Sequence, residues 1–143
     1  MSSLSIGSTR AEADTRRSRH RRVFAIALGL QLLIGAFFLL LPTFSLGVVG
    51  LSPLMGPEWP SIWGATLIFV TLMQVPGAID PVNQRYANVV AVLGRGLMAL
   101  TFAWHGLAGE PAFLWFAAFD LAFGTAIYLG FRRMVIAELQ TRP

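Results

Sequence analysis

The sequence predicts an all-α protein, a four-helix transmembrane bundle with both termini in the cytoplasm. Hydrophobic residues make up 55% of the 143 residues and charged residues only 13%, so a soluble domain of this size could not bury all of its apolar surface. Four apolar runs approach the roughly 20 residues that a helix needs to cross a bilayer. Nearly all arginines lie outside these runs, which is typical of a membrane protein with charged ends.

The predicted membrane domain covers residues 23–133 and contains four spans. The first run, VFAIALGLQLLIGAFFLLL, is interrupted only by Gln31. The alternative for this run is a cleaved signal peptide, which has an apolar region of about 7 to 15 residues and then an A-x-A site. The run is longer and no such site follows it, which favours a span. We therefore predict spans at about 23–41, 59–79, 87–107 and 111–131.

The connections between the spans carry further signals. Asp80-Pro81 and Glu110-Pro111 each pair an acidic residue with a proline, which is typical of the start of a helix. The third helix is therefore expected to begin as early as Pro81. The segment 42–60 is apolar but broken by proline and glycine, which predicts a stretch that lies on the membrane surface or folds back over the bundle.

The two ends of the chain are charged. Residues 1–22 are rich in serine, arginine and acidic residues without an apolar periodicity, which predicts a disordered arm; residues 134–143 are predicted to form a cytoplasmic tail. All basic residues are arginine, and all but Arg95 lie in the tails or in the 76–86 connection. The positive-inside rule then places both termini in the cytoplasm of a bacterium, with the chain in the inner membrane. Because this topology explains the basic arm, no nucleic-acid partner is predicted.

Two charged residues lie inside the predicted spans. Counted from the flanking arginines at 1.5 Å per residue, Arg95 is roughly 15 Å and Asp120 roughly 18 Å from the cytoplasmic side. They lie on consecutive antiparallel helices, which a short connection makes neighbours. A charge at the centre of a span costs about 2.5 to 3.5 kcal/mol, and pairing offsets this cost. The sequence therefore predicts an Arg95–Asp120 ion pair inside the bundle.

Two amides extend this pair into a candidate intramembrane polar site. Gln31 of the first span lies roughly 14 Å deep, and Asn88 shares a face of the third helix with Arg95. The predicted site therefore consists of Arg95, Asp120, Gln31 and Asn88. Either these groups are structural fasteners that fix the register of the helices, or they form a binding site or proton path.

Glycines flank both charged residues. Gly94 and Gly96 enclose Arg95, and Gly124 lies one turn beyond Asp120. Because glycine lets helix backbones approach one another, we expect close helix contacts at these positions.

No sequence signature predicts an enzyme. The chain has no cysteine and contains no metal-ligand cluster, nucleotide loop or catalytic triad motif. His105 lies at the outer end of the third span, where it is expected to be interfacial, and His20 falls in the arm. We therefore predict no catalytic residue, no metal and no cofactor.

Several short motifs resemble a known group of proteins. They are the LLLP that ends the first span, Trp63-Gly64, Asp80-Pro81 with Arg85 after it, the arginine of LGRG at 95, and Asp120. From about Phe24 to Arg133 the chain resembles the small bacterial four-helix membrane proteins of the DoxX-like and BphX-like families. Some members of these families resemble subunits or neighbours of quinone-using oxidoreductase systems, so the resemblance implies an accessory role.

The sequence thus favours a non-enzymatic accessory or interaction subunit in the lipid bilayer, as a homo-oligomer or in a larger membrane complex. An alternative is a component of a membrane oxidoreductase system that binds a quinone or another hydrophobic small molecule. Its pocket would be formed by the four polar residues and an aromatic wall of Phe102, Phe113 and Phe116. A third hypothesis is a small transporter that acts as an oligomer.

Overall fold

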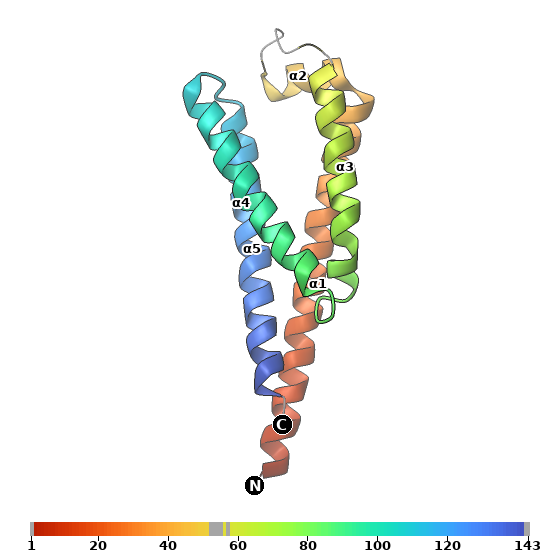
Figure 1. Ribbon diagram of the computed structural model, residues 1–143, viewed down its shortest axis with the longest axis vertical. Coiled ribbons are helices and arrows are strands. Elements are labelled where there is room, and N and C mark those ends of the chain that lie inside the picture. The colour runs from red at the N-terminus through yellow and green to blue at the C-terminus, as the bar shows by residue number, and fades with distance from the viewer. Residues whose placement is uncertain (1, 52–55, 57, 142–143) are drawn as a thin grey trace.

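The chain folds into an elongated bundle of helices, seen in a computed structural model that describes residues 2–51, 56 and 58–141 (Figure 1). The described residues form four long helices and one short one and contain no strand: α1 (Ser2–Leu40), α2 (Pro42–Val49), α3 (Glu58–Ile79), α4 (Arg85–Ala108) and α5 (Phe113–Gln140). The four long helices are long and apolar enough to cross a membrane. The predicted all-α four-helix bundle is confirmed.

The long helices form two pairs, α1 with α3 and α4 with α5, and α5 also packs on α1. Figure 1 shows that the pairs lie close together at the end where the two termini are found and spread apart toward the other end, where α2 lies. We call the end with the two termini the lower end and the end with α2 the upper end. Both termini lie at the lower end, as expected for an even number of spans.

The N-terminal segment differs from its prediction. Residues 2–22, expected to be a disordered arm, continue α1 as one helix. Two kinds of contact stabilise this extension: Glu12 and Arg16 pair one turn apart on α1, and Arg17 pairs with Glu138 near the end of α5. Because the second pair joins distant parts of the chain, no local pattern predicts it. Most of the predicted tail 134–143 likewise belongs to α5, and residues 142 and 143 lie outside the described part.

Glycines allow α1 and α3 to cross at close range. A Cβ atom added at Gly64 would lie 2.6 Å from the carbonyl oxygen of Gly35, which leaves no room for a side chain. The two helix backbones approach this closely because glycine has none. One turn further, the rings of Phe38 and Trp63 meet edge to face with centroids 4.7 Å apart. These contacts hold α1 against α3, the pair of helices that forms one side of the candidate functional site.

The connection after α1 folds back over the bundle, one of the two arrangements predicted for residues 42–60. α2 ends at Gly50, whose φ of 75° is left-handed and favours glycine. Leu46 and Leu51 are buried against a cluster that includes Phe102 and Phe113. The upper end is therefore covered by α2. Residues 52–55 and 57 of this connection lie outside the described part of the chain.

Two helices begin later than the sequence indicates. α4 begins at Arg85 and not at Pro81, because Asp80 closes a turn instead of capping a helix: its carboxylate accepts hydrogen bonds from Asn83, and its carbonyl accepts one from the Gln84 N–H. The two hydrogen bonds from Asn83 lower the pKa of the Asp80 carboxyl. α5 similarly begins at Phe113, after a turn that starts at Glu110.

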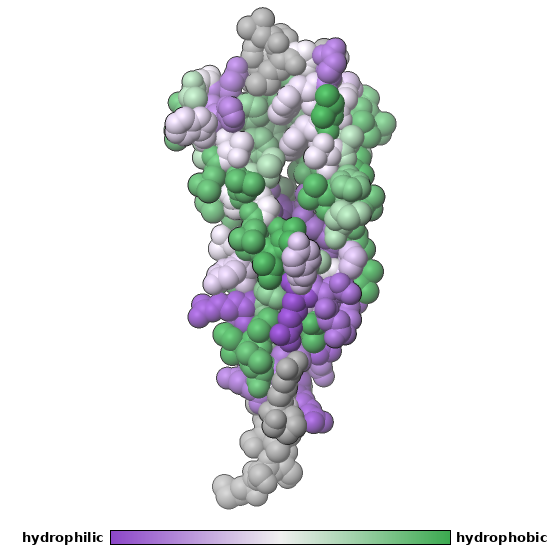
Figure 2. Space-filling model, in the orientation of Figure 1, coloured by the Kyte–Doolittle hydropathy of each residue, from purple (hydrophilic) through white to green (hydrophobic). Residues whose placement is uncertain are grey.

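The outer surface of the bundle is apolar. Leu93 and Leu97 on α4 are each 67% exposed and Leu100 is 72% exposed. On the face seen in Figure 2, hydrophobic side chains cover much of the upper body and hydrophilic ones gather in the lower part. An apolar surface of this extent is stable in lipid and not in water, so the chain is a multi-pass membrane protein.

Candidate functional site

Three helices bring one polar side chain each to the middle of the bundle. Arg95 of α4 is 3% exposed and donates from Nη1 to Asp120 Oδ1 of α5 over 2.9 Å. Its other terminal nitrogen, Nη2, donates to Gln31 Oε1 of α1 over 2.5 Å. The guanidinium also lies 5.8 Å from the ring centroids of Phe119 and Phe123, within range of a cation–π interaction. We call Gln31, Arg95 and Asp120 the central cluster.

Only one of the three glycines near the charges makes the close contact that the sequence predicts. A Cβ atom added at Gly124 would lie 3.3 Å from the Cβ of Arg95, so α4 and α5 do approach closely there. At Gly94 and Gly96 an added Cβ would meet nothing within 4 Å. The prediction for these two residues is wrong, because they lie beside the buried face of α4 and not on it.

Asn88, the fourth residue of the predicted site, does not join the central cluster. It lies two turns closer to the lower end and is completely buried. Its amide nitrogen donates to the carbonyls of Gly77 and Gln84, and its oxygen lies 2.8 Å from His20 Nε2. The prediction failed because residues on one face of a helix can lie at different depths. We call His20 and Asn88 the lower cluster.

Sequence reasoning missed His20, which it placed in the arm. The residue is 1% exposed and its ring contacts those of Phe24 and Phe131. Since the Asn88 oxygen can only accept, His20 donates from Nε2. Its Nδ1 is buried without a hydrogen-bond partner among the described residues and faces Gly130, where an added Cβ would lie 3.0 Å away. The absence of a side chain at Gly130 gives the ring its space.

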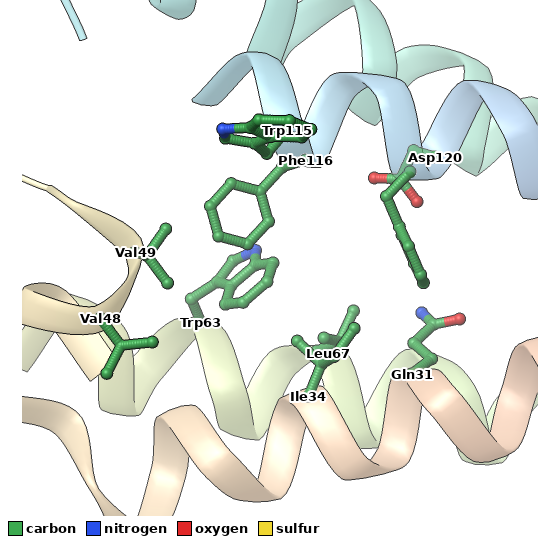
Figure 3. Close-up of a pocket in the computed structure, with 10 residues that line it drawn as sticks. Gln31, Ile34, Val48, Val49, Trp63, Leu67, Trp115, Phe116 and Asp120 are labelled. Atoms are coloured by element: carbon green, nitrogen blue, oxygen red, sulfur yellow. The ribbon is translucent and has the colours of Figure 1, made fainter. Parts of the chain in front are cut away.

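A cavity of about 370 Å³ adjoins the central cluster (Figure 3). Gln31 and Asp120 lie at one end, and the other walls are apolar and aromatic, with Trp63, Trp115 and Phe116 among them. Val48 and Val49 of α2 line the upper end. The volume falls in the range of small-molecule sites, which are typically about 300 to 1,000 Å³.

The predicted aromatic wall is present but only partly faces this cavity. Phe102 and Phe113 stack at 5.5 Å, and Phe116 lies 5.3 Å from Phe102. Of the three, Phe116 lines the cavity, whereas Phe102 and Phe113 pack behind it with the buried residues of α2. Trp63, which packs against Phe116 at 5.2 Å, completes the wall.

The central cluster leaves polar atoms available at the cavity. Asp120 uses Oδ1 for Arg95 and Gln31 uses Oε1, so the second carboxylate oxygen and the amide nitrogen make no hydrogen bond within the described residues. Figure 3 shows the Gln31 amide and the Asp120 carboxylate on opposite sides of the same end of the cavity. The site therefore offers one acceptor and one donor to a molecule inside an otherwise apolar space.

The remaining histidine and the acidic residues add no metal site to the described part of the chain. His105 is exposed at the upper end of α4, with its ring 6.1 Å from that of Phe113. Within residues 2–51, 56 and 58–141, no three His, Asp or Glu side chains gather so that they could hold a metal ion.

Comparison of the chain with protein-family models, with curated proteins and with solved structures finds no match.

Proposed function

We propose that the protein binds a small hydrophobic molecule with a polar end group inside the membrane, at the cavity beside the central cluster. The observation that carries this proposal is the junction of an apolar cavity with two polar atoms that make no hydrogen bond within the described residues. Leaving a polar group unpaired in an apolar surrounding costs about 1 to 3 kcal/mol. A ligand that satisfies the free atoms of Gln31 and Asp120 offsets this cost.

The chemistry of the two free groups defines the ligand. The Gln31 amide donates, which suits a carbonyl oxygen, and the Asp120 carboxylate accepts, which suits a hydroxyl. The aromatic rings of Trp63 and Phe116 suit a flat apolar body. A quinol head group combines these features, because its hydroxyl both donates and accepts. A volume of about 370 Å³ accommodates a substituted ring better than a long chain.

The location follows from the distribution of arginine. All arginines except Arg95 lie in the terminal segments or in the connection between α3 and α4. Under the positive-inside rule, the lower end faces the cytoplasm of a bacterium and the chain is an inner-membrane protein. The cavity then lies in the outer half of the bilayer, beneath α2. Active signal from a reporter fused after Pro143 on the outer side of the membrane would contradict this orientation.

Within this proposal the protein acts as a non-enzymatic accessory subunit that holds its ligand for a partner, as a homo-oligomer or in a larger membrane complex. The resemblance to the DoxX-like and BphX-like families remains a prediction that agrees with such a role. Co-purification from the native membrane tests it: a redox enzyme that elutes with this protein supports an accessory subunit, and elution as a monomer alone contradicts it.

Ligand binding can be tested by filling the cavity. Leu67 lines it, and Leu72 lies on the exposed face of the same helix. The purified protein is titrated calorimetrically with a short-chain ubiquinol analogue, kept reduced. We expect Leu67→Trp to weaken binding about 5- to 150-fold, because overpacking costs about 1 to 3 kcal/mol. Leu72→Trp, the matched control, is expected to bind as the unaltered protein does.

These outcomes distinguish binding of the analogue in the cavity from its nonspecific partition into the detergent. Equal binding by both tryptophan variants and the unaltered protein would mean that the analogue does not occupy the cavity. Absence of any saturable binding to the unaltered protein would contradict the quinone-type ligand.

A further inference from the structure

A second groove lies between α1 and α5 at the lower end, well away from the central cluster. Its volume is about 490 Å³. Arg16 and Arg19 of α1 and Arg133 of α5 line it, and no acidic residue does. Arg19 and Arg133 make no ion pair within the described residues. Arg16 forms an ion pair with Glu12 and also donates to the carbonyl of Arg133. Three cations therefore face one hollow with little neutralisation.

The other half of the same groove is apolar. α1 and α5 run antiparallel, so the residues one to two turns above the arginines lie side by side: Val23 on α1 with Ala126 and Leu129 on α5. The groove thus changes from cationic at the lower end to apolar toward the middle of the bundle. A phospholipid in the leaflet at the lower end has the same polarity along the same axis.

A buried group without a partner lies between the two halves. His20 lines the groove together with Gly130, and its Nδ1 has no hydrogen-bond partner among the described residues. Buried polar atoms of native proteins are nearly always paired. In the neutral ring, whose proton is on Nε2, this nitrogen is an acceptor, and a hydroxyl of a lipid head group would satisfy it.

From these observations we propose that the groove binds an anionic phospholipid of the adjacent leaflet. The phosphodiester group lies among Arg16, Arg19 and Arg133, and an acyl chain follows Val23 and Leu129. Basic pockets between transmembrane helices on the cytoplasmic side commonly bind anionic head groups. This inference concerns a different site from the cavity of the proposed function and does not depend on it.

The groove on the other side of α1 does not offer the same combination. Arg21 and Arg22 line it, but its α3 wall consists of Val75, Ala78 and Ile79. Its cations therefore come from one helix only, and none of the buried unpaired atoms lies in its wall. Two helices with cations on both sides of the hollow define a head-group position, which a single helix does not.

Lipid retention measured by native mass spectrometry tests the assignment. The detergent-purified full chain is mixed with phosphatidylglycerol or with zwitterionic phosphatidylcholine. We expect the unaltered protein to retain phosphatidylglycerol selectively. R19Q with R133Q removes two exposed cations of the groove, and we expect about 30-fold weaker retention, since each cation near a phosphate contributes roughly fivefold.

Two further variants separate the groove from general charge. R10Q with R132Q removes the same number of exposed arginines outside the groove, and we expect retention close to that of the unaltered protein. R19K with R133K keeps the charges and should restore most of the binding, because lysine binds phosphate as a point charge. Melting temperatures show whether all variants are folded, which is expected because the replaced side chains are exposed.

Three results would overturn the inference. The first is equal loss in the two glutamine pairs, which indicates nonspecific attraction. The second is equal retention of phosphatidylcholine and phosphatidylglycerol. The third is release of the bound lipid by an equal concentration of inorganic phosphate, which would show that the groove recognises free anions and not lipid.

Discussion

The two polar clusters inside the bundle differ in how completely their side-chain amides are satisfied. In the lower cluster, both donors and the acceptor of the Asn88 amide are used, by two carbonyls and by His20. In the central cluster, Arg95 joins Gln31 and Asp120 but leaves one polar atom of each unused at a cavity.

This difference separates the two roles that the sequence left open. A buried amide with all its hydrogen bonds made within the protein has nothing left for a ligand, and it fixes the position of α1 relative to α3 and α4. A buried ion pair that borders an apolar cavity also joins helices, but its free atoms favour binding. We therefore expect Asn88 to affect stability alone and the central cluster to affect both stability and binding in the cavity.

The largest expected effect comes from Arg95→Met. The substitution leaves the carboxylate of Asp120 buried without its cation, and breaking a buried pair from one side typically costs about 3 to 5 kcal/mol. We expect a loss of that size in the free energy of unfolding, measured by denaturant titration in detergent micelles. Asp120→Val should destabilise the protein by a similar amount, since it leaves the guanidinium unpaired.

The double variant, Arg95→Met with Asp120→Val, sharpens the comparison. Replacing both partners by apolar residues removes the unpaired charge, so most of the stability should return. Binding of the ubiquinol analogue should not return, because the Asp120 oxygen that accepts from its hydroxyl is gone. A double variant that is stable and still binds the analogue would show that the central cluster is a fastener only.

An intermediate effect is expected for Asn88→Leu. It leaves the His20 Nε2 and the Gly77 carbonyl without a partner, and each unsatisfied buried group costs about 1 to 3 kcal/mol. The free energy of unfolding should fall by about that amount, with no change in affinity for the analogue. Adding His20→Phe removes the other partner and should recover part of the loss. A weaker affinity in Asn88→Leu would mean that the two clusters act as one site.

The sequence predicts the central cluster because it indicates both how deep each polar residue lies in the membrane and which helices are neighbours. Hydropathy locates the spans, the flanking arginines give the depth of Arg95, Asp120 and Gln31, and a short connection makes α4 and α5 neighbours. Asn88 was assigned to the wrong cluster because it shares a helix face with Arg95 but not its depth.

Other features depend on contacts between distant segments. The helical extension that carries His20 is stabilised by the Arg17–Glu138 pair, and no apolar pattern in residues 1–22 indicates it. The cavity exists because the two helix pairs spread apart at the upper end. The angle between the helix pairs is set by the packing of α1 on α5 and of α3 on α4, which a single sequence does not reveal.

The smallest effect concerns the glycines around the central cluster. Gly124→Ala places a Cβ 3.3 Å from the Cβ of Arg95, so the helices must separate slightly, whereas Gly94→Ala meets nothing within 4 Å. Both changes gain helix propensity, up to about 1 kcal/mol in water. Gly94→Ala should therefore be neutral or stabilising, and Gly124→Ala should be less stable than it by about 1 kcal/mol. Both variants add one methyl group at a glycine inside a long helix, and only Gly124 faces Arg95. Equal stability would therefore place Arg95 away from the α4–α5 contact.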